Sequence, residues 1–216
     1  IKKKRPSSIR AESIVMLLKK HQEVMTQVYD MAYTKEIKGE KVPNEEKIFS
    51  IYEQHTDIIV KGSRDVKFGH KIDLTSGRSN LVLKCDVLQG NPSDSKLFAP
   101  ALDSIIDGYG IVPRDCATDG GYASLVNQLH AAEKGVVNIV FNKIVGSLQN
   151  ISSSKNMETR LKKWRSGAEA IISNIKRVFN LTRCTWKGWQ NFVSKVLWSV
   201  IAYNIRVMTA HVVRLI

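Results

Sequence analysis

The stretch RLKKWRSGAEAIISNIKRVF, residues 160–179, decides how the rest of the chain is interpreted. Its spacing predicts a basic amphipathic helix with one acid, Glu169, set among cations. Four of its residues lie at offsets of four, three and four, and so share one helical face: Arg165, Glu169, Ile172 and Lys176. Such a face suits a site that holds a metal ion and a phosphate group, because carboxylates bind hard cations and Arg and Lys bind phosphate oxygens. A solvated helix with i,i+4 charge pairs has the same spacing, so the rest of the chain has to decide.

The composition points to a polyanionic partner. The 216 residues are enough for a domain with a hydrophobic core, and 43% hydrophobic and 25% charged residues are typical of a globular protein. However, 33 Lys and Arg face 20 Asp and Glu, which gives a net charge of +13 and a pI near 9.7. Nucleic acid is the first candidate for the partner, and an acidic membrane surface is the second.

The cysteines favour a reducing compartment. Cys85, Cys116 and Cys184 are odd in number and far apart, and the chain has no C-x-x-C motif. A disulfide framework and a zinc site are therefore not expected, and we predict a cytoplasmic protein. We recognise no signal peptide, and the most apolar stretch, residues 196–205, is too short to span a bilayer.

The amino-terminal part predicts a helix and then strands. Residues 1–7 form a basic arm, and residues 8–35 carry an apolar stripe at helical spacing: Ile14, Leu17, Leu18, His21, Val24, Met25, Val28 and Met31. Residues 47–60, 66–74 and 81–90 are rich in β-branched residues and predict strands, the last two forming a hairpin over 66–90 around the turn TSGRSN.

The remainder predicts alternating helices and strands. A helix is expected up to about Asp107, a strand that ends near Asp119, a helix over 123–133, a strand over 136–141, the basic helix, and a last helix over about 189–213. An antiparallel portion followed by strand–helix alternation indicates an α/β fold.

Two acids of this pattern are candidates for catalysis. Asp119 closes a predicted strand, and Glu169 lies on a later helix, so both side chains can reach the carboxyl edge of the sheet. Converging carboxylates without a Cys or an obligatory His favour Mg²⁺ or Mn²⁺. Two such ions can activate a water molecule and stabilise a leaving oxygen, which favours a metal-dependent nuclease or polynucleotidyl transferase.

At these residues the chain resembles a known family. TDGGYAS (118–124), the spacing R-x₃-E-x₆-K from Arg165 to Lys176, and a following long apolar helix are similar to the DDE transposases of bacterial insertion sequences. The resemblance is strongest to the group with a Tyr-Arg-Glu-Lys signature. IFSIYEQHTDIIVKG (48–62) and FGHKI (68–72) also resemble segments of such transposases, so the resemblance covers about residues 48–210.

The resemblance implies a fold and a set of roles. The fold would be RNase H-like, a mixed sheet flanked by helices, with residues 1–46 as a basic arm and helical insertion and residues 47–216 as a partial catalytic core. Asp119 would be the second acid and Glu169 the third, holding a two-ion Mg²⁺ or Mn²⁺ site. Four cations would contact DNA: Lys162, Arg165, Lys176 and Arg177. The partner would be double-stranded DNA at transposon ends and at the target, bound by a homodimer or larger assembly and without a membrane, and the chemistry would be nicking followed by strand transfer.

The sequence departs from the family at two points. Lys162 stands where the signature has Tyr, and we find no first acid. We expect that acid on a strand upstream of Ile1, in agreement with a chain that does not begin with Met, and we expect the 216-residue chain alone not to cut DNA. Asp57, Asp73 and Asp86 are the substitutes within the chain, although Asp73 and Asp86 are expected to face solvent on hairpin strands.

Two other functions remain open. One is a catalytically inactive DNA-binding module derived from a transposase, which upstream coding sequence with or without an Asp-bearing strand would distinguish. The other is a peripheral membrane protein that uses the basic arm and the last helix, which leaves Asp119 and Glu169 unexplained.

Overall fold

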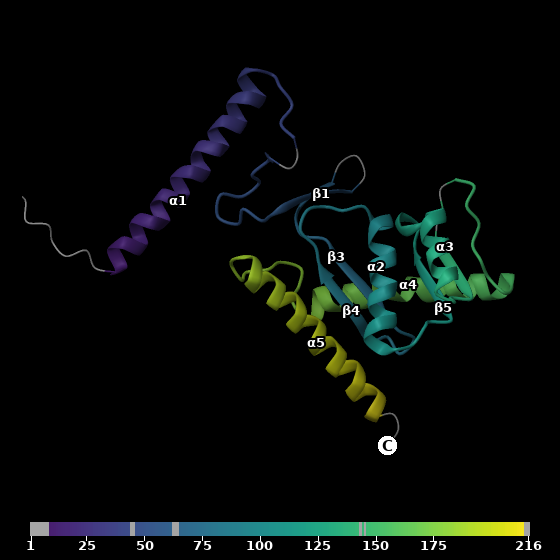
Figure 1. Cartoon of the computed structure of the whole chain (residues 1–216). Helices are drawn as coiled ribbons and strands as arrows, with labels where there is room; N and C mark the ends of the chain where they lie inside the picture. Colours follow the sequence, from purple (N-terminus) through teal and green to yellow (C-terminus); the bar gives the residue numbers. More distant parts are fainter. Residues whose placement is uncertain (1–8, 44–45, 62–64, 143, 145, 214–216) are drawn as a thin grey trace, which may run out of the picture. The chain divides into compact units, whose positions relative to one another are not determined.

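The computed structural model describes residues 9–43, 46–61, 65–142, 144 and 146–213 (Figure 1). The chain divides into two compact units, Ile1–His70 and Lys71–Ile216, and each is described by itself. The division at His70 lies later in the chain than the domain boundary that the resemblance suggests at residue 46.

The first unit contains a long helix and a small hairpin. Helix α1, Ile9–Ala32, runs into the π-helical turn η1, Tyr33–Ile37. Strand β1, Asp57–Lys61, pairs antiparallel with β2, Asp65–Gly69. The strand predicted over 47–60 is therefore correct only in its last part, because residues 47–56 consist mainly of bends and turns. The predicted basic arm, residues 1–7, lies outside the described residues.

The apolar stripe of α1 is present but largely uncovered. The stripe predicts a helix, and residues 9–32 are helical. Val24 is the one buried residue of α1, whereas Ile14, Leu17 and Leu18 are about half exposed or more.

The second unit follows a strand–helix order. The hairpin of β3 and β4 comes first, then the crossover β5–α3–β6, and then two long helices (Figure 1). The bounds are β3 Ile72–Ser76, β4 Val82–Val87, α2 Asp94–Tyr109, β5 Asp115–Asp119, η3 Gly120–Tyr122, α3 Leu125–Glu133, β6 Asn138–Asn142, α4 Lys155–Val178 and α5 Trp189–Val213. Most of these elements agree with the predicted ones within a few residues, and the α/β class is confirmed.

The predicted hairpin over residues 66–90 is confirmed around the turn TSGRSN, where β3 pairs with β4, but its amino-terminal end is wrong. The segment 66–74 is not one strand but the end of β2 and the start of β3, and β2 pairs with β1 rather than with β4. The break has a local cause: Gly69 adopts φ of 149°, a backbone conformation that residues with a Cβ rarely adopt. His70 then starts a new direction before β3 pairs with β4.

The strands do not form one continuous sheet. β3 and β4 make one antiparallel pair, β5 and β6 make one parallel pair, and β1 and β2 make a third sheet in the first unit. Among the described residues of the second unit, no backbone ladder joins the β3–β4 sheet to the β5–β6 sheet. The described strands of the second unit thus form separate two-stranded sheets, and the expected single mixed sheet is not seen among them.

Two apolar clusters hold the second unit together. One lies between α2, α3 and β6, with buried Phe98, Leu102, Ala131, Val136, Ile139 and Phe141. The other joins β4, α4 and α5, with buried Val82, Ile171, Ile175, Val200 and Tyr203. Because α4 packs on β5 and β6 and also on α5, it connects both halves of the unit and fixes where its polar face lies.

Helix α5 is long and apolar, with a mixed environment. By length and composition alone it could cross a membrane, a test that the core helices of soluble proteins also pass. Val196, Ser199, Val200 and Tyr203 are buried against the rest of the unit. The predicted core role holds for this face, whereas Ile201 and Met208 of the predicted stripe are about half exposed.

Candidate active site

Asp119 occupies the carboxyl end of a parallel strand pair. It is the last residue of β5 and is in register with Asn142, the last residue of β6. Its Oδ1 accepts a hydrogen bond of 3.1 Å from the backbone N–H of Gly120, which starts the 3₁₀ turn η3. In open α/β folds, ligands bind at this edge, so the sequence-based placement of Asp119 is correct.

Glu169 and Arg165 come to the same edge from α4. The helix starts at a capping Ser154, whose Oγ accepts from the N–H of Met157. Arg165 and Glu169 are one turn apart on its polar face, while Ile171 and Ile175 are buried. Packing of α4 on β5 therefore sets the position of the two polar side chains.

Arg165 binds both acids. Its Nη2 lies 2.9 Å from Asp119 Oδ2, and its Nη1 lies 2.6 Å from Glu169 Oε1. The side chain of Arg165 is 16% exposed, whereas those of Asp119 and Glu169 are 49% and 69% exposed. The structure thus brings Asp119 and Glu169 together, as the sequence predicts, and places between them the guanidinium of Arg165, for which the family resemblance implies a contact with DNA. That these acids bind a metal ion or perform catalysis stays a prediction.

The residues after Asp119 explain the motif TDGGY. A Cβ at Gly121 would lie against the carboxylate of Asp94 at the start of α2, so a larger residue there would require the Asp94 side chain to move. Tyr122 then reaches β3, where its hydroxyl donates a 2.6 Å hydrogen bond to Asp73 Oδ1. Burial, followed by the nearby Asp73 carboxylate, raises the pKa of Tyr122, so it stays a hydrogen-bond donor at neutral pH.

The prediction that Asp73 faces solvent is wrong. Asp73 is 7% exposed, because its face of β3 is covered by Tyr122 and the neighbouring elements. Asp86, opposite it on β4, is partly exposed and forms an ion pair with Lys84. As cross-strand partners, Asp73 and Asp86 lie on the same face of the hairpin, so alternation does not distinguish them, and the sequence alone did not show that Tyr122 would cover Asp73.

The other predicted DNA contacts lie along α4. Lys162 forms an ion pair of 2.6 Å with Glu158, one turn away. Lys176 and Arg177 are exposed in the last turns of the helix. Their cationic groups are available on the surface, but their contact with DNA stays a prediction.

Sequence reasoning missed a polar chain in the first unit. His55 lies between Glu53 and His70, with Nε2 2.8 Å from Glu53 Oε2 and Nδ1 2.7 Å from His70 Nε2. His70 Nδ1 lies 3.0 Å from Asp57 Oδ2, so Asp57, a substitute for the first acid by sequence, is held by a histidine in this unit. The spacing E-x-H-x-D followed by a distant His could have indicated such a chain of hydrogen bonds. However, no helical or strand periodicity relates His70 to residues 53–57, so the sequence did not place them together.

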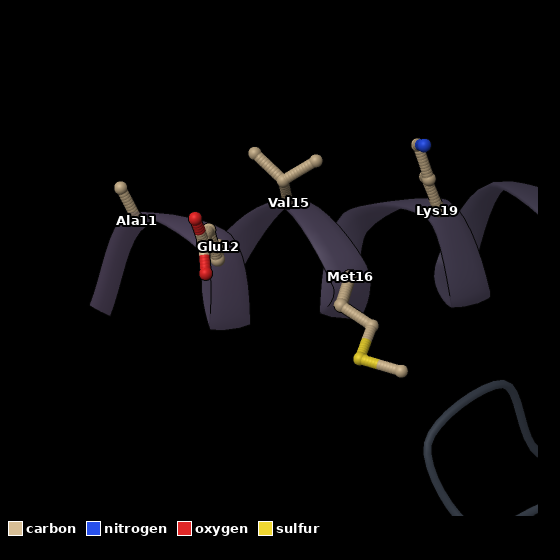
Figure 2. Close-up of a pocket in the computed structure, with 5 residues that line it drawn as sticks. All are labelled: Ala11, Glu12, Val15, Met16 and Lys19. Carbon is tan, nitrogen blue, oxygen red and sulfur yellow. The ribbon is translucent and has the colours of Figure 1, made fainter. Parts of the chain in front are cut away.

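A hollow along α1 offers no comparable chemistry. It is lined by residues of that helix alone: Ala11, Glu12, Val15, Met16 and Lys19 (Figure 2). Figure 2 shows Val15 and Lys19 projecting to one side of the ribbon and Met16 to the other. A wall formed by a single helix does not enclose a small ligand, which typically loses most of its surface on binding.

The two acids at Arg165 are oxygen ligands of the type that a hard divalent cation prefers, but two carboxylates are too few to complete its coordination. Each carboxylate directs one oxygen at the guanidinium, so both already surround a position that attracts positive charge. Oxygen ligands of this type suit Mg²⁺ and Mn²⁺. Within the described residues, however, no group of three or more His, Cys, Asp or Glu side chains converges on a metal position. Water, substrate oxygens or a further acid would have to complete the coordination.

Comparison with models of protein families gives a match over most of the chain. The family model described as Transposase DDE domain matches residues 64–205, well over half of the chain. The matched segment includes Asp73, Asp119, Arg165 and Glu169. No curated protein and no solved structure matches the chain.

Proposed function

The chain belongs to the transposase DDE domain family, and from that premise we propose that it is the catalytic part of a transposase that cuts DNA and joins the freed 3′ end to target DNA. Its function therefore lies in DNA transposition. The observation that carries the finer proposal is the meeting of Asp119 and Glu169, fifty positions apart in sequence, on the guanidinium of Arg165. An accidental surface pair would not place both acids at the carboxyl edge of a parallel strand pair.

The chain's own residues would position and neutralise charge. The family generally uses divalent metal ions, which supply an activated water molecule and stabilise the leaving oxygen. Asp119 and Glu169 would hold these ions. Lys162, Lys176 and Arg177 would bind phosphates along α4 and align the strand, since phosphoryl transfer depends mainly on positioning and on electrostatic stabilisation.

We further propose that a strand carrying the first acid is added between the two sheets, giving an RNase H-like arrangement. Support comes from the facing elements: β3 pairs with β4 and β5 pairs with β6, while Tyr122, just after β5, already spans to Asp73 on β3. A strand in this position would bring its side chains next to Asp119. It would also supply the third carboxylate that the described residues lack around Arg165.

Asp73 is the alternative source of that third carboxylate. It is buried on β3 and linked through Tyr122 to the turn that follows Asp119. If Asp73 has this role, the 216-residue chain cuts DNA on its own, and Asp73→Asn removes the activity. If the added strand supplies the acid, the chain alone is inactive.

The test uses a complete transposase that contains this chain, bound to labelled DNA in Mg²⁺ or Mn²⁺. We expect Glu169→Gln to abolish cleavage without weakening DNA binding measured in the absence of divalent ions, since the charge that binds the metal is lost and no phosphate contact is removed. Lys176→Ala is the matched comparison: it should weaken binding and lower the salt slope by about 1, because a phosphate contact releases a counterion. Equal loss of binding and cleavage in Glu169→Gln would mark Glu169 as structural and contradict the proposal.

The second candidate is a DNA-binding module that has lost catalysis. It is favoured by the two acids, rather than three, that meet at Arg165 within the described residues. The net charge of +13 suits DNA in either case. A complete protein that binds DNA but shows no metal-dependent cleavage would support this candidate. In either case we propose a cytoplasmic protein that acts on paired DNA ends as a dimer or larger assembly.

A further inference from the structure

Arg165 is buried more deeply than the acids it binds. Its side chain is 16% exposed, against 49% for Asp119 and 69% for Glu169, so the guanidinium lies beneath two carboxylates that open to solvent. A guanidinium in contact with two carboxylates at 2.9 and 2.6 Å forms strong, charge-assisted hydrogen bonds with both. The pair of acids is therefore already neutralised in part by a cation of the chain itself.

A divalent cation and Arg165 would compete for the charge of the same two acids. Asp119 Oδ2 and Glu169 Oε1 accept from Arg165, and a divalent ion that bridged the two acids would lie close to this guanidinium. Metal binding must then displace Arg165, use the outer oxygens, or share these oxygens with the guanidinium. In each case the positive charge of Arg165 opposes metal binding, because like charges at short range repel.

Arg165 has a natural alternative partner in the proposed substrate. The fork of a guanidinium matches a phosphate group as well as a carboxylate pair. A phosphate placed beside α4 would compete for Arg165, and each contact that Arg165 transfers to phosphate releases an acid oxygen. Phosphate binding and metal binding would then favour each other through this one side chain.

We infer that Arg165 is the internal counter-ion of the metal site and couples metal binding to DNA binding. This inference rests on the proposed function. Without DNA, Arg165 holds Asp119 and Glu169 and keeps metal affinity low. With DNA, a phosphate takes Arg165 and the acids become available. Metal ions are thereby bound tightly only where a strand is present to be cut.

The experiment measures Mn²⁺ affinity of a complete transposase that contains this chain by electron paramagnetic resonance, with and without a saturating short duplex. We expect DNA to tighten Mn²⁺ binding by about 5–150-fold, the usual range for coupling between two sites. In Arg165→Met, Mn²⁺ should bind more tightly than in the wild type without DNA, and DNA should add less than twofold. Circular dichroism checks that the variant stays folded.

Lys163→Met is the matched control. It removes one positive charge from the same helix at an exposed position, and the ion pairs of Asp119 and Glu169 are with Arg165. It should retain the full dependence on DNA. If Lys163→Met acts like Arg165→Met, long-range charge explains the effect and the role of Arg165 is refuted.

Other outcomes separate this inference from the proposed function. If the wild type shows no DNA dependence, or Arg165→Met keeps it, Arg165 is not the link, while the metal site still stands. If Mn²⁺ binding survives Asp119→Asn combined with Glu169→Gln, or the wild type binds no Mn²⁺, the metal site itself fails and the inference falls with it.

Discussion

Helices α1 and α4 have the same length but differ in how much of their apolar stripe is buried. Each has 24 residues, and each carries an apolar stripe at helical spacing. In α4 the stripe is covered at Leu161, Ile171 and Ile175, whereas α1 buries only Val24. The stripe therefore predicts that a helix forms, but the neighbouring elements decide whether it is buried. Only α4, with strands and α5 to pack on, can hold a polar face in a fixed place.

The largest effect is expected when one side chain is truncated in the apolar stripe of each helix. Ile175 is 2% exposed in the cluster of β4, α4 and α5, and Leu17 of α1 is 55% exposed. We expect Ile175→Ala to lower the free energy of unfolding by about 2–5 kcal/mol, because it leaves a cavity. Leu17→Ala should change it by no more than about 0.5 kcal/mol. Urea unfolding measures both: tryptophan fluorescence follows the second unit, since Trp164 and Trp198 lie on α4 and α5, and far-ultraviolet circular dichroism follows α1, which has no Trp.

A control substitution at an exposed position of α4 tests whether the loss of stability depends on burial of the side chain or on which helix is changed. Val178, at the end of α4, is 56% exposed, and Val178→Ala should be close to neutral. If Leu17→Ala proved as costly as Ile175→Ala, α1 would be buried in solution by a surface outside the described contacts. The comparison between the helices would then be wrong.

Much of the second unit could be predicted because its signals are local. The Pro-Ser-Asp before α2, the glycines after Asp119 and the 3.6-residue period of α4 each fix an element without reference to distant residues. The pairing of β2 could not be predicted in the same way. Residues 66–74 have one continuous strand pattern, and the break at Gly69 depends on a backbone angle that glycine permits but does not require.

In the candidate site, too, some features follow from local sequence patterns and others depend on residues far apart in the sequence. Asp119 and Glu169 were predictable because a strand end and a helix face each have a recognisable pattern, and an α/β order brings them to one edge. The burial of Asp73 and its bond to Tyr122 depend on how η3 meets β3, forty-nine positions away in sequence. The position of Arg165 between the two acids depends on the distance between β5 and α4. The spacing of residues in the sequence does not give this distance.

A smaller test compares serines near the starts of the two helices. Ser154 caps α4 by accepting from the N–H of Met157, whereas Ser13 of α1 donates to the carbonyl of Ile9 inside the helix. Ser154→Ala should cost about 0.5–2 kcal/mol and speed amide exchange in the first turn of α4, because an N–H loses its partner. Ser13→Ala should be neutral or slightly stabilising, since Ala has the higher helix propensity.

Amide exchange read by NMR or mass spectrometry decides this case. Faster exchange confined to residues 155–158 supports the cap. Equal effects of Ser154→Ala and Ser13→Ala would show that capping does not distinguish the helices.

The smallest effect concerns charge in the first turn of α4. Glu158 accepts from Lys162 at 2.6 Å and from Asn150 at 2.8 Å, and these bonds hold the pKa of Glu158 below its ordinary value of 4.5. Because the folded pKa is lower than the unfolded one, this interaction stabilises the fold above pH 4.5, and the contribution is lost as the pH falls through the folded value. An i,i+4 pair near the surface contributes about 0.3–0.5 kcal/mol, so the stability change on Glu158→Gln should be small. NMR titration of the Glu158 carboxyl should show its pKa move back toward 4.5 in Lys162→Met, because that variant removes the first donor. If the pKa of Glu158 is the same in Lys162→Met, Asn150 alone lowers this pKa. The ion pair between Lys162 and Glu158 then contributes nothing at the amino end of α4.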